Sequence, residues 1–175
     1  HEGAIETLQT DDINGVQSLY GAPGFVPAND NFASAGVLTL SGGAAEATGS
    51  NIAATAQAGE PQHDGETPTH SVWWRWSAVS STPVTLTTYG SNFDTVMAVY
   101  TGASVNALTQ VASNDDEDRG VIRTSKLSFT PTAGTTYYVA VDGWDGAFGQ
   151  IALSLSTGDT STSPPAITPQ PSNQT

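Results

Sequence analysis

The hydrophobic residues between positions 29 and 156 fall in short runs that are separated by Gly, Asn, Asp, Ser and Thr. Several runs alternate apolar and polar residues, as in KLSFTP at 126–131 and QIALSLS at 150–156. Such alternation is typical of half-buried strands, and frequent turn residues between the runs favour a sandwich. We predict strands at 37–40, 52–56, 71–78, 84–88, 95–101, 108–112, 125–130, 136–142 and 150–156. The pattern therefore predicts an all-β fold, an antiparallel and jelly-roll-like β-sandwich of about eight or nine strands.

The aromatic stretch SVWWRWSA at 71–78 indicates which side chains enter the core. Because successive side chains of a strand point to opposite faces, Trp74 and Trp76 share an apolar face, whereas Trp73 and Arg75 share the other. The first pair is expected in the core and the second pair nearer the solvent. Exposed aromatic side chains are flat anchors for peptides or sugars. Our candidates for ligand binding are Trp73, Arg75, Tyr138 and Trp144. The alternative is that these aromatic residues cover a sheet edge or pack beneath a loop.

The segment LQTDDINGVQSLYG at 8–21 is the one stretch with a helical pattern. Thr10 is a suitable N-cap, apolar residues repeat at helical spacing, and Gly21 supplies a C′ residue. A helix of this length is marginal in water by itself, so we expect one short N-terminal helix that packs on an external surface. The expected organisation is a terminal helix in 1–21, a linker at 22–28, the sandwich at 29–156 and a Ser/Thr/Pro-rich tail or linker at 157–175.

The charge of the chain excludes several classes of partner. The net charge is −13, and the cations are Arg75, Arg119, Arg123 and Lys126 alone. Without a basic stripe, neither nucleic acid nor an anionic membrane is an expected partner. No long apolar run predicts a membrane-spanning helix, and the absence of cysteine excludes disulfides and thiolate metal sites.

Clustered Asp and Asn residues in the loops are candidates for a calcium site, because calcium is bound by oxygen ligands. The local candidates are Asp94 and the acidic run Asn114, Asp115, Asp116, Glu117 and Asp118, of which Asp94, Asn114, Asp115 and Asp116 are the predicted ligands. The alternative for Asp94 and Asp115 is that they cap turns through hydrogen bonds to the backbone. A second cluster, His63, Asp64, Glu66 and His70, has zinc-binding atoms. Its loop, with Pro and Gly, does not fix their spacing, so we do not expect a zinc site there.

The terminal helix resembles the last helix of the catalytic domain of matrixins, which are zinc metalloproteases. The matching residues are Leu8, Asp11, Asp12, Ile13, Gly15, Gln17, Leu19, Tyr20 and Gly21. The family's zinc-binding motif is missing, because His1 and Glu2 are followed by no second His at the required spacing. The resemblance implies that zinc belongs only to an absent catalytic domain, and the start at His1 suggests a fragment. We therefore expect no enzyme activity in this chain and a zinc metalloendopeptidase as its parent.

The region from Asn29 to Ser156 resembles pre-peptidase C-terminal domains, β-sandwich modules of secreted bacterial peptidases that are related to collagenase collagen-binding domains. The resemblance is carried by NDNFASA, GEPQH, SVWWRW, FDTVMAVYTG, VASNDDED, AGTTYYVAVDG and GQIALSLS. It implies a calcium-binding Asn-Asp pair at Asn29 and Asp30. It departs from the family at His70 and Ser71, where carboxylates are expected.

Together these features predict a secreted, non-catalytic accessory domain that binds an extracellular protein polymer, collagen-like or other, close to its parent enzyme. A short tether would convert capture of that substrate into an intramolecular event. Two alternatives stay open. One is a cleavable maturation, secretion or autoinhibitory appendage that docks on the parent catalytic domain. The other is a carbohydrate-binding module that contacts polysaccharide through Trp73, Trp144 and Tyr138.

Overall fold

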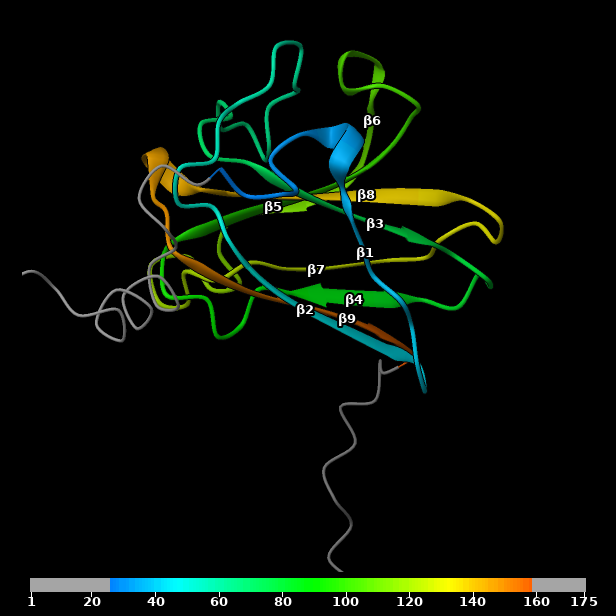
Figure 1. The fold of residues 1–175 in the computed structure, drawn as a ribbon. Helices are drawn as coiled ribbons and strands as arrows, with labels where there is room; N and C mark the ends of the chain where they lie inside the picture. Colours follow the sequence, from blue (N-terminus) through cyan, green and yellow to red (C-terminus); the bar gives the residue numbers. More distant parts are fainter. Residues whose placement is uncertain (1–25, 159–175) are drawn as a thin grey trace, which may run out of the picture.

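The computed structural model describes residues 26–158. The helix predicted in 8–21 and the tail from residue 159 lie outside the described residues. Two β-sheets face each other in the described part (Figure 1), so the predicted all-β sandwich is confirmed. The first sheet contains, in spatial order, β1 (Gly36–Val37), β3 (Val72–Ser77), β8 (Thr136–Gly143), β5 (Thr95–Thr101) and β6 (Thr109–Asn114). The second sheet contains β2 (Ala44–Ser50), β9 (Gln150–Thr157), β4 (Val84–Thr87) and β7 (Lys126–Phe129).

Most strand pairs are antiparallel, and β1 pairs with β3 in parallel. Three short 3-10 turns complete the described elements: η1 (Phe32–Ser34), η2 (Val105–Ala107) and η3 (Trp144–Gly146). No helix within residues 26–158 is long and apolar enough to cross a membrane.

One predicted strand is wrong and one observed strand was not predicted. Residues 52–56 form no strand, because a turn closes where the Ala54 amide donates to the Asn51 carbonyl and Ala53 takes a left-handed φ of 61°. The strand is instead β2, which pairs with β9 along its whole length. Its sequence, AAEATGS, is rich in small residues of low strand propensity. Backbone pairing with β9 and burial of Ala45 therefore fix a strand that the local sequence does not indicate.

The main core lies between the two sheets. Trp74 and Trp76 are buried there, as the alternation predicts, together with Leu86, Val99 and Leu153. β9 alternates buried and partly exposed residues, so only one of its faces contributes to this core. That arrangement is the one expected of a sheet that is solvated on its other side.

A second apolar cluster covers the outer face of the first sheet and corrects one expectation. Trp73, predicted to be solvent-facing, is 0% exposed. We call this second group the outer cluster; it consists of Phe32, Ala35, Trp73, Ala98, Tyr100 and Ala140. η1 and the loop between β2 and β3 lie over this face in Figure 1. β5 is buried on both of its faces, and its sequence TVMAVYT contains a continuous apolar run. Such a run, without alternation, is typical of a strand that is covered on both sides.

Candidate cation site

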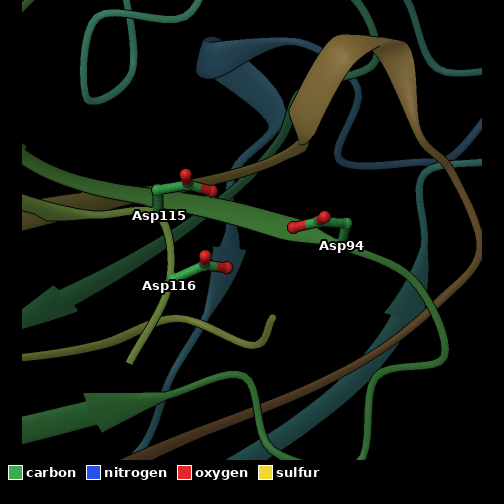
Figure 2. A group of neighbouring side chains, drawn as sticks. All are labelled: Asp94, Asp115 and Asp116. Atoms are coloured by element: carbon green, nitrogen blue, oxygen red, sulfur yellow. The ribbon is translucent and has the colours of Figure 1, made fainter. Parts of the chain in front are cut away.

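Three aspartates approach one another at one end of the first sheet. Asp94 directly precedes β5, and Asp115 and Asp116 directly follow β6. β5 and β6 are antiparallel neighbours, with Met97 paired to Asn114, so the start of β5 and the end of β6 lie at the same edge. One carboxylate oxygen from each aspartate lies within 4.8 Å of the others. Figure 2 shows the carboxylates of Asp94 and Asp115 directed toward each other.

Short hydrogen bonds fix the loop that carries two of these aspartates. The Asn114 side-chain amide donates to the Asp116 carbonyl at 3.1 Å, and its oxygen accepts from the Lys126 amide at 2.8 Å. The Asp116 carboxylate accepts from the Gly120 amide at 3.0 Å. Asn114, predicted as a calcium ligand, is therefore engaged in holding the chain around Asp115 and Asp116.

Two carboxylate oxygens in the group have no hydrogen-bond partner. Oδ1 of Asp94 and Oδ1 of Asp115 are both shielded from solvent and unpaired. The other Asp94 oxygen accepts from Arg123 Nη1 at 2.9 Å. A buried carboxylate oxygen without a donor is costly, because it has lost its hydration. A positively charged group or ion beside these two oxygens would therefore be stabilised.

The raised pKa of Asp115 also indicates that its negative charge lacks compensation. Its pKa is raised to about 6, first by burial and then by the neighbouring charges of Asp116, Asp94 and Asp64, while Arg119 acts in the opposite direction. Like charges disfavour ionisation of a nearby carboxyl group, and a cation bound among them would favour it.

The three aspartates line a pocket of about 340 Å³. Its other lining residues are Arg119, Gly120, Arg123 and Trp144. Trp144, in η3, is 43% exposed, and its backbone amide donates to the Asp94 carbonyl at 3.1 Å. An exposed indole ring therefore lies beside the carboxylates.

The donor set of the pocket is suited to a hard cation. All three groups are carboxylates, and calcium takes roughly six to eight oxygen ligands from carboxylates, carbonyls and water. No imidazole or thiolate belongs to the group, so it lacks the nitrogen and sulfur ligands that are typical of structural zinc sites. Asp94, Asp115 and Asp116 are the residues of the predicted calcium set that the structure brings together.

The predicted pair near the domain start lies outside this group and has other partners. Asp30 is buried, and its carboxylate accepts from the Thr55 amide at 2.6 Å and from the Thr55 hydroxyl at 3.0 Å. Asn29 donates from its side chain to the Trp73 carbonyl at 3.0 Å. These bonds tie the start of the domain to the β2–β3 loop and to β3.

The four residues of the predicted zinc-type cluster have separate partners. Both ring nitrogens of His63 face other side chains, and Asp64 accepts from the Ser113 hydroxyl at 2.6 Å. The His70 ring packs against Phe148 with centroids 5.5 Å apart, and Glu66 forms a backbone bridge with His63. The four side chains form no metal-ligating group within residues 26–158.

The predicted aromatic ligand residues are divided among different places. Trp73 lies inside the outer cluster, and Tyr138 packs on Phe32 at a centroid distance of 4.2 Å. Arg75 is exposed and pairs with Tyr138 across β3 and β8. Only Trp144 lies at the aspartate pocket. Tyr138 lies five residues before the end of β8 at Gly143, and Trp144 follows in η3, so about 17 Å of strand separates Tyr138 from the start of η3.

Sequence reasoning missed Asp142, a buried carboxylate near the end of β8. It accepts hydrogen bonds from the amides of Thr69, His70 and Gly143 and from the Thr69 hydroxyl. The sequence does contain a signal for this residue, because Asp142 is a lone charged residue that directly follows the apolar run YYVAV. A charge in such a buried strand requires hydrogen-bond partners.

No protein-family model and no curated protein matches the sequence. Among solved structures, the chain is similar to PliG of Aeromonas hydrophila, a periplasmic inhibitor of g-type lysozyme, at 14% identity, a TM-score of 0.47, and coverage of 71% of this chain and 96% of that one. It is similar to the pre-peptidase C-terminal domain of a Bacillus anthracis collagenase at 13% identity, a TM-score of 0.43, and coverage of 69% and 90%. It is also similar to CorA, a surface-associated copper-binding protein of Methylomicrobium album BG8, at 12% identity, a TM-score of 0.46, and coverage of 71% and 98%. At these identities and TM-scores, the likenesses carry no argument about the family, ligand or partner of this chain.

Proposed function

We propose that this chain is a non-catalytic β-sandwich accessory module of a secreted protein and that it binds calcium through Asp94, Asp115 and Asp116. The observation that carries the proposal is the pair of buried, unpaired oxygens on Asp94 and Asp115. A divalent cation between them would replace the missing hydrogen-bond donors, and it would offset both the burial and the like-charge repulsion that raise the pKa of Asp115. Extracellular modules commonly bind calcium with dissociation constants of about 10⁻⁴–10⁻³ M, which suits a site in which three carboxylates supply the side-chain ligands and water would supply others.

The bound ion would order the end of the domain where a partner can be captured. It would link the start of β5 to the end of β6, beside η3. Trp144 and Phe148 lie in the β8–β9 connection and are 43% and 57% exposed. Exposed aromatic residues beside a fixed charge are typical anchors for a protein surface. We therefore assign this end of the sandwich to an extracellular protein polymer, held close to a parent metalloendopeptidase.

Titration calorimetry with calcium chloride tests the metal site. The full chain should bind one calcium ion, and Asp115→Asn should weaken binding at least about tenfold, because a ligand charge is lost. Asp118→Asn is the matched control, since it removes the same charge from an exposed residue of the same loop. No heat of binding in the wild type, or equal losses in both variants, would contradict a specific site.

Pull-down on insoluble collagen and elastin tests the partner. Binding should require calcium and should fall in Trp144→Ala, but not in Tyr89→Ala, which removes an aromatic residue of similar exposure from the second sheet's side. If the chain binds no protein polymer and instead inhibits its parent protease when added separately, polymer binding is contradicted and the appendage alternative is favoured.

A further inference from the structure

A chain of buried hydrogen bonds closes the loop 57–66 over the outer face of the first sheet. The side chains of His63 and Glu60 are 0% and 1% exposed. His63 Nδ1 lies 2.7 Å from the Tyr100 hydroxyl, and His63 Nε2 lies 3.1 Å from Glu60 Oε1. The Tyr100 hydroxyl also lies 2.8 Å from the Gln62 carbonyl, and the second Glu60 oxygen accepts from the Gln57 amide at 2.7 Å. The loop is thus bonded to itself and to β5 through one imidazole ring.

The hydrogens available to this chain can be counted. Tyr100 has a single hydroxyl hydrogen, which it donates to the Gln62 carbonyl. His63 Nδ1 must then carry a hydrogen and donate it to the Tyr100 oxygen. An ionised carboxylate only accepts, so one further proton must lie between His63 Nε2 and Glu60. Without that proton, one hydrogen bond is lost in either tautomer of the ring. Either the buried carboxylate faces the lone pair of Nε2, or Nε2 donates to Glu60, the Tyr100 hydroxyl turns to Nδ1 and the Gln62 carbonyl loses its donor.

We infer that Glu60, His63 and Tyr100 form a proton-dependent latch, in which the proton shared by Glu60 and His63 keeps the loop 57–66 closed over the outer cluster. When the pair holds this proton, it is neutral overall and every hydrogen bond is made. When the proton leaves, a negative charge remains buried on Glu60 with the Gln57 amide as its one backbone donor, and opening of the loop into water relieves it. The stability that the latch contributes is therefore present at lower pH and is lost as the pH rises.

The groups that face His63 favour this behaviour. Burial raises the pKa of Tyr100, and the charges of Glu60 and Asp64, which belong to the same loop, raise it further, so the phenol stays protonated as a donor. β3 presents the uncharged Trp73 ring, at a centroid distance of 5.7 Å from His63. η1 presents Phe32, which packs on Trp73 at 5.4 Å. Within residues 26–158, no Lys or Arg forms an ion pair with Glu60 or contacts the imidazole, so no cation there replaces the shared proton once it is lost.

The latch extends to the aspartate pocket through Asp64. Its carboxylate accepts from the Ser113 hydroxyl at 2.6 Å, one residue before Asn114 and two before Asp115. Opening of the loop would remove one negative charge from the surroundings of Asp115. This last link rests on the proposed calcium site, whereas the latch itself does not.

Hydrogen exchange at the Trp73 indole Nε1, followed by NMR in calcium-free buffer with chelator, tests the latch. The indole is fully buried beneath the loop and adjoins His63, so it exchanges only when the cover opens. After correction for the intrinsic rate of free indole, the opening equilibrium constant should increase by up to about tenfold per pH unit over the range in which the closed loop holds the proton and the open loop has released it, which is the linkage expected for one proton. A flat opening rate from mildly acidic to mildly alkaline pH would overturn the inference.

The substitution Glu60→Gln identifies the shared proton as the cause. A neutral amide can either donate to Nε2 or accept from it, so the latch should stay closed and the pH dependence should disappear. Glu66→Gln, which removes a charge from the same loop, should keep the wild-type dependence. Equal dependence in Glu60→Gln and in the wild type would refute the assignment.

The NMR chemical shifts of the His63 ring nitrogens in the unmodified chain give a second readout. Nε2 should lose its proton over the pH range in which indole exchange accelerates. A ring that loses no proton there would refute the latch even if the variants do not fold.

Discussion

Two regions of the molecule use aspartates with solvent-shielded oxygens in opposite ways. In the anchor region, where the β2–β3 loop joins the first sheet, Asp30 and Asp142 accept two and four hydrogen bonds. In the pocket region, Asp94 and Asp115 each keep a shielded oxygen without a donor. The sequence assigns the same residue type to both regions, so composition alone does not distinguish them.

The difference shows how a buried carboxylate acquires its role. Where backbone amides surround it, the carboxylate fixes a loop, because each donor that points inward would otherwise be unsatisfied. Where other carboxylates surround it, the missing compensation must come from a proton or a cation. The anchor region is thus expected to be sensitive to mutation, and the pocket region to pH and to calcium.

The largest expected effect belongs to Asp142→Ala in the anchor region. Three backbone amides, those of Thr69, His70 and Gly143, would lose their acceptor. A buried donor without a partner costs about 1–3 kcal/mol, so the free energy of unfolding should fall by about 3–5 kcal/mol in urea denaturation. Asp142→Asn keeps one acceptor oxygen and should lose less. An alanine variant as stable as the wild type would show that these amides are not truly buried.

Asp30→Ala should have a smaller effect, because it removes two bonds to one residue, Thr55. We expect the free energy of unfolding to fall by about 2 kcal/mol. Asp118→Ala, at an exposed aspartate whose φ is not left-handed, serves as the comparison and should change it by less than about 0.5 kcal/mol. Similar losses at both positions would remove the distinction between anchored and exposed aspartates.

In the pocket region, we expect the free energy of unfolding to depend on pH when calcium is absent. Because the fold raises the pKa of Asp115 from 3.8 to about 6, the unfolded chain releases this proton more readily. The contribution of Asp115 is therefore fully present below pH 3.8 and is lost as the pH rises through about 6. Asp115→Asn should remove this slope and stabilise the calcium-free chain at neutral pH by no more than about 1 kcal/mol, since solvent screens the partly exposed group. Chemical denaturation across this pH range measures both quantities, and an unchanged slope in the variant would assign the effect elsewhere.

The smallest effect on stability is expected for Arg123→Gln. The ion pair of Arg123 with Asp94 is 2.9 Å long, but the arginine side chain is 69% exposed, so its loss should change the free energy of unfolding by less than about 0.5 kcal/mol. Its effect on calcium should be larger and favourable, because a positive charge leaves the pocket. We expect calcium affinity to rise about fivefold, which corresponds to about 1 kcal/mol. Weaker calcium binding in this variant would place the cation away from Asp94.

Alternation along the strands was sufficient to predict the sandwich and the inward positions of Trp74 and Trp76. It could not predict that Trp73 is buried, because a period of two separates the faces of a strand but does not show whether a distant segment covers the outer face. β2 was not predicted, for a related reason. Its small residues are held by pairing with β9, about a hundred positions away in the sequence.

The candidate site was partly predictable. Asp94, Asp115 and Asp116 could be proposed as ligands because acidic residues cluster at the ends of predicted strands. That Asp30 is satisfied by Thr55, whereas Asp115 is not satisfied, depends on how loops pack after folding. Such packing has no signature in local sequence, so the anchor region and the pocket region cannot be distinguished from the sequence alone.

A crystal structure of the chain grown with calcium tests the central claim most directly. We expect a single ion with oxygen ligands from Asp94, Asp115 and Asp116 at about 2.3–2.6 Å, with the remaining positions filled by water or backbone carbonyls. Anomalous scattering would identify the ion as calcium. A calcium ion held instead by Asn29 and Asp30, or an aspartate pocket that stays empty at millimolar calcium, would contradict the account.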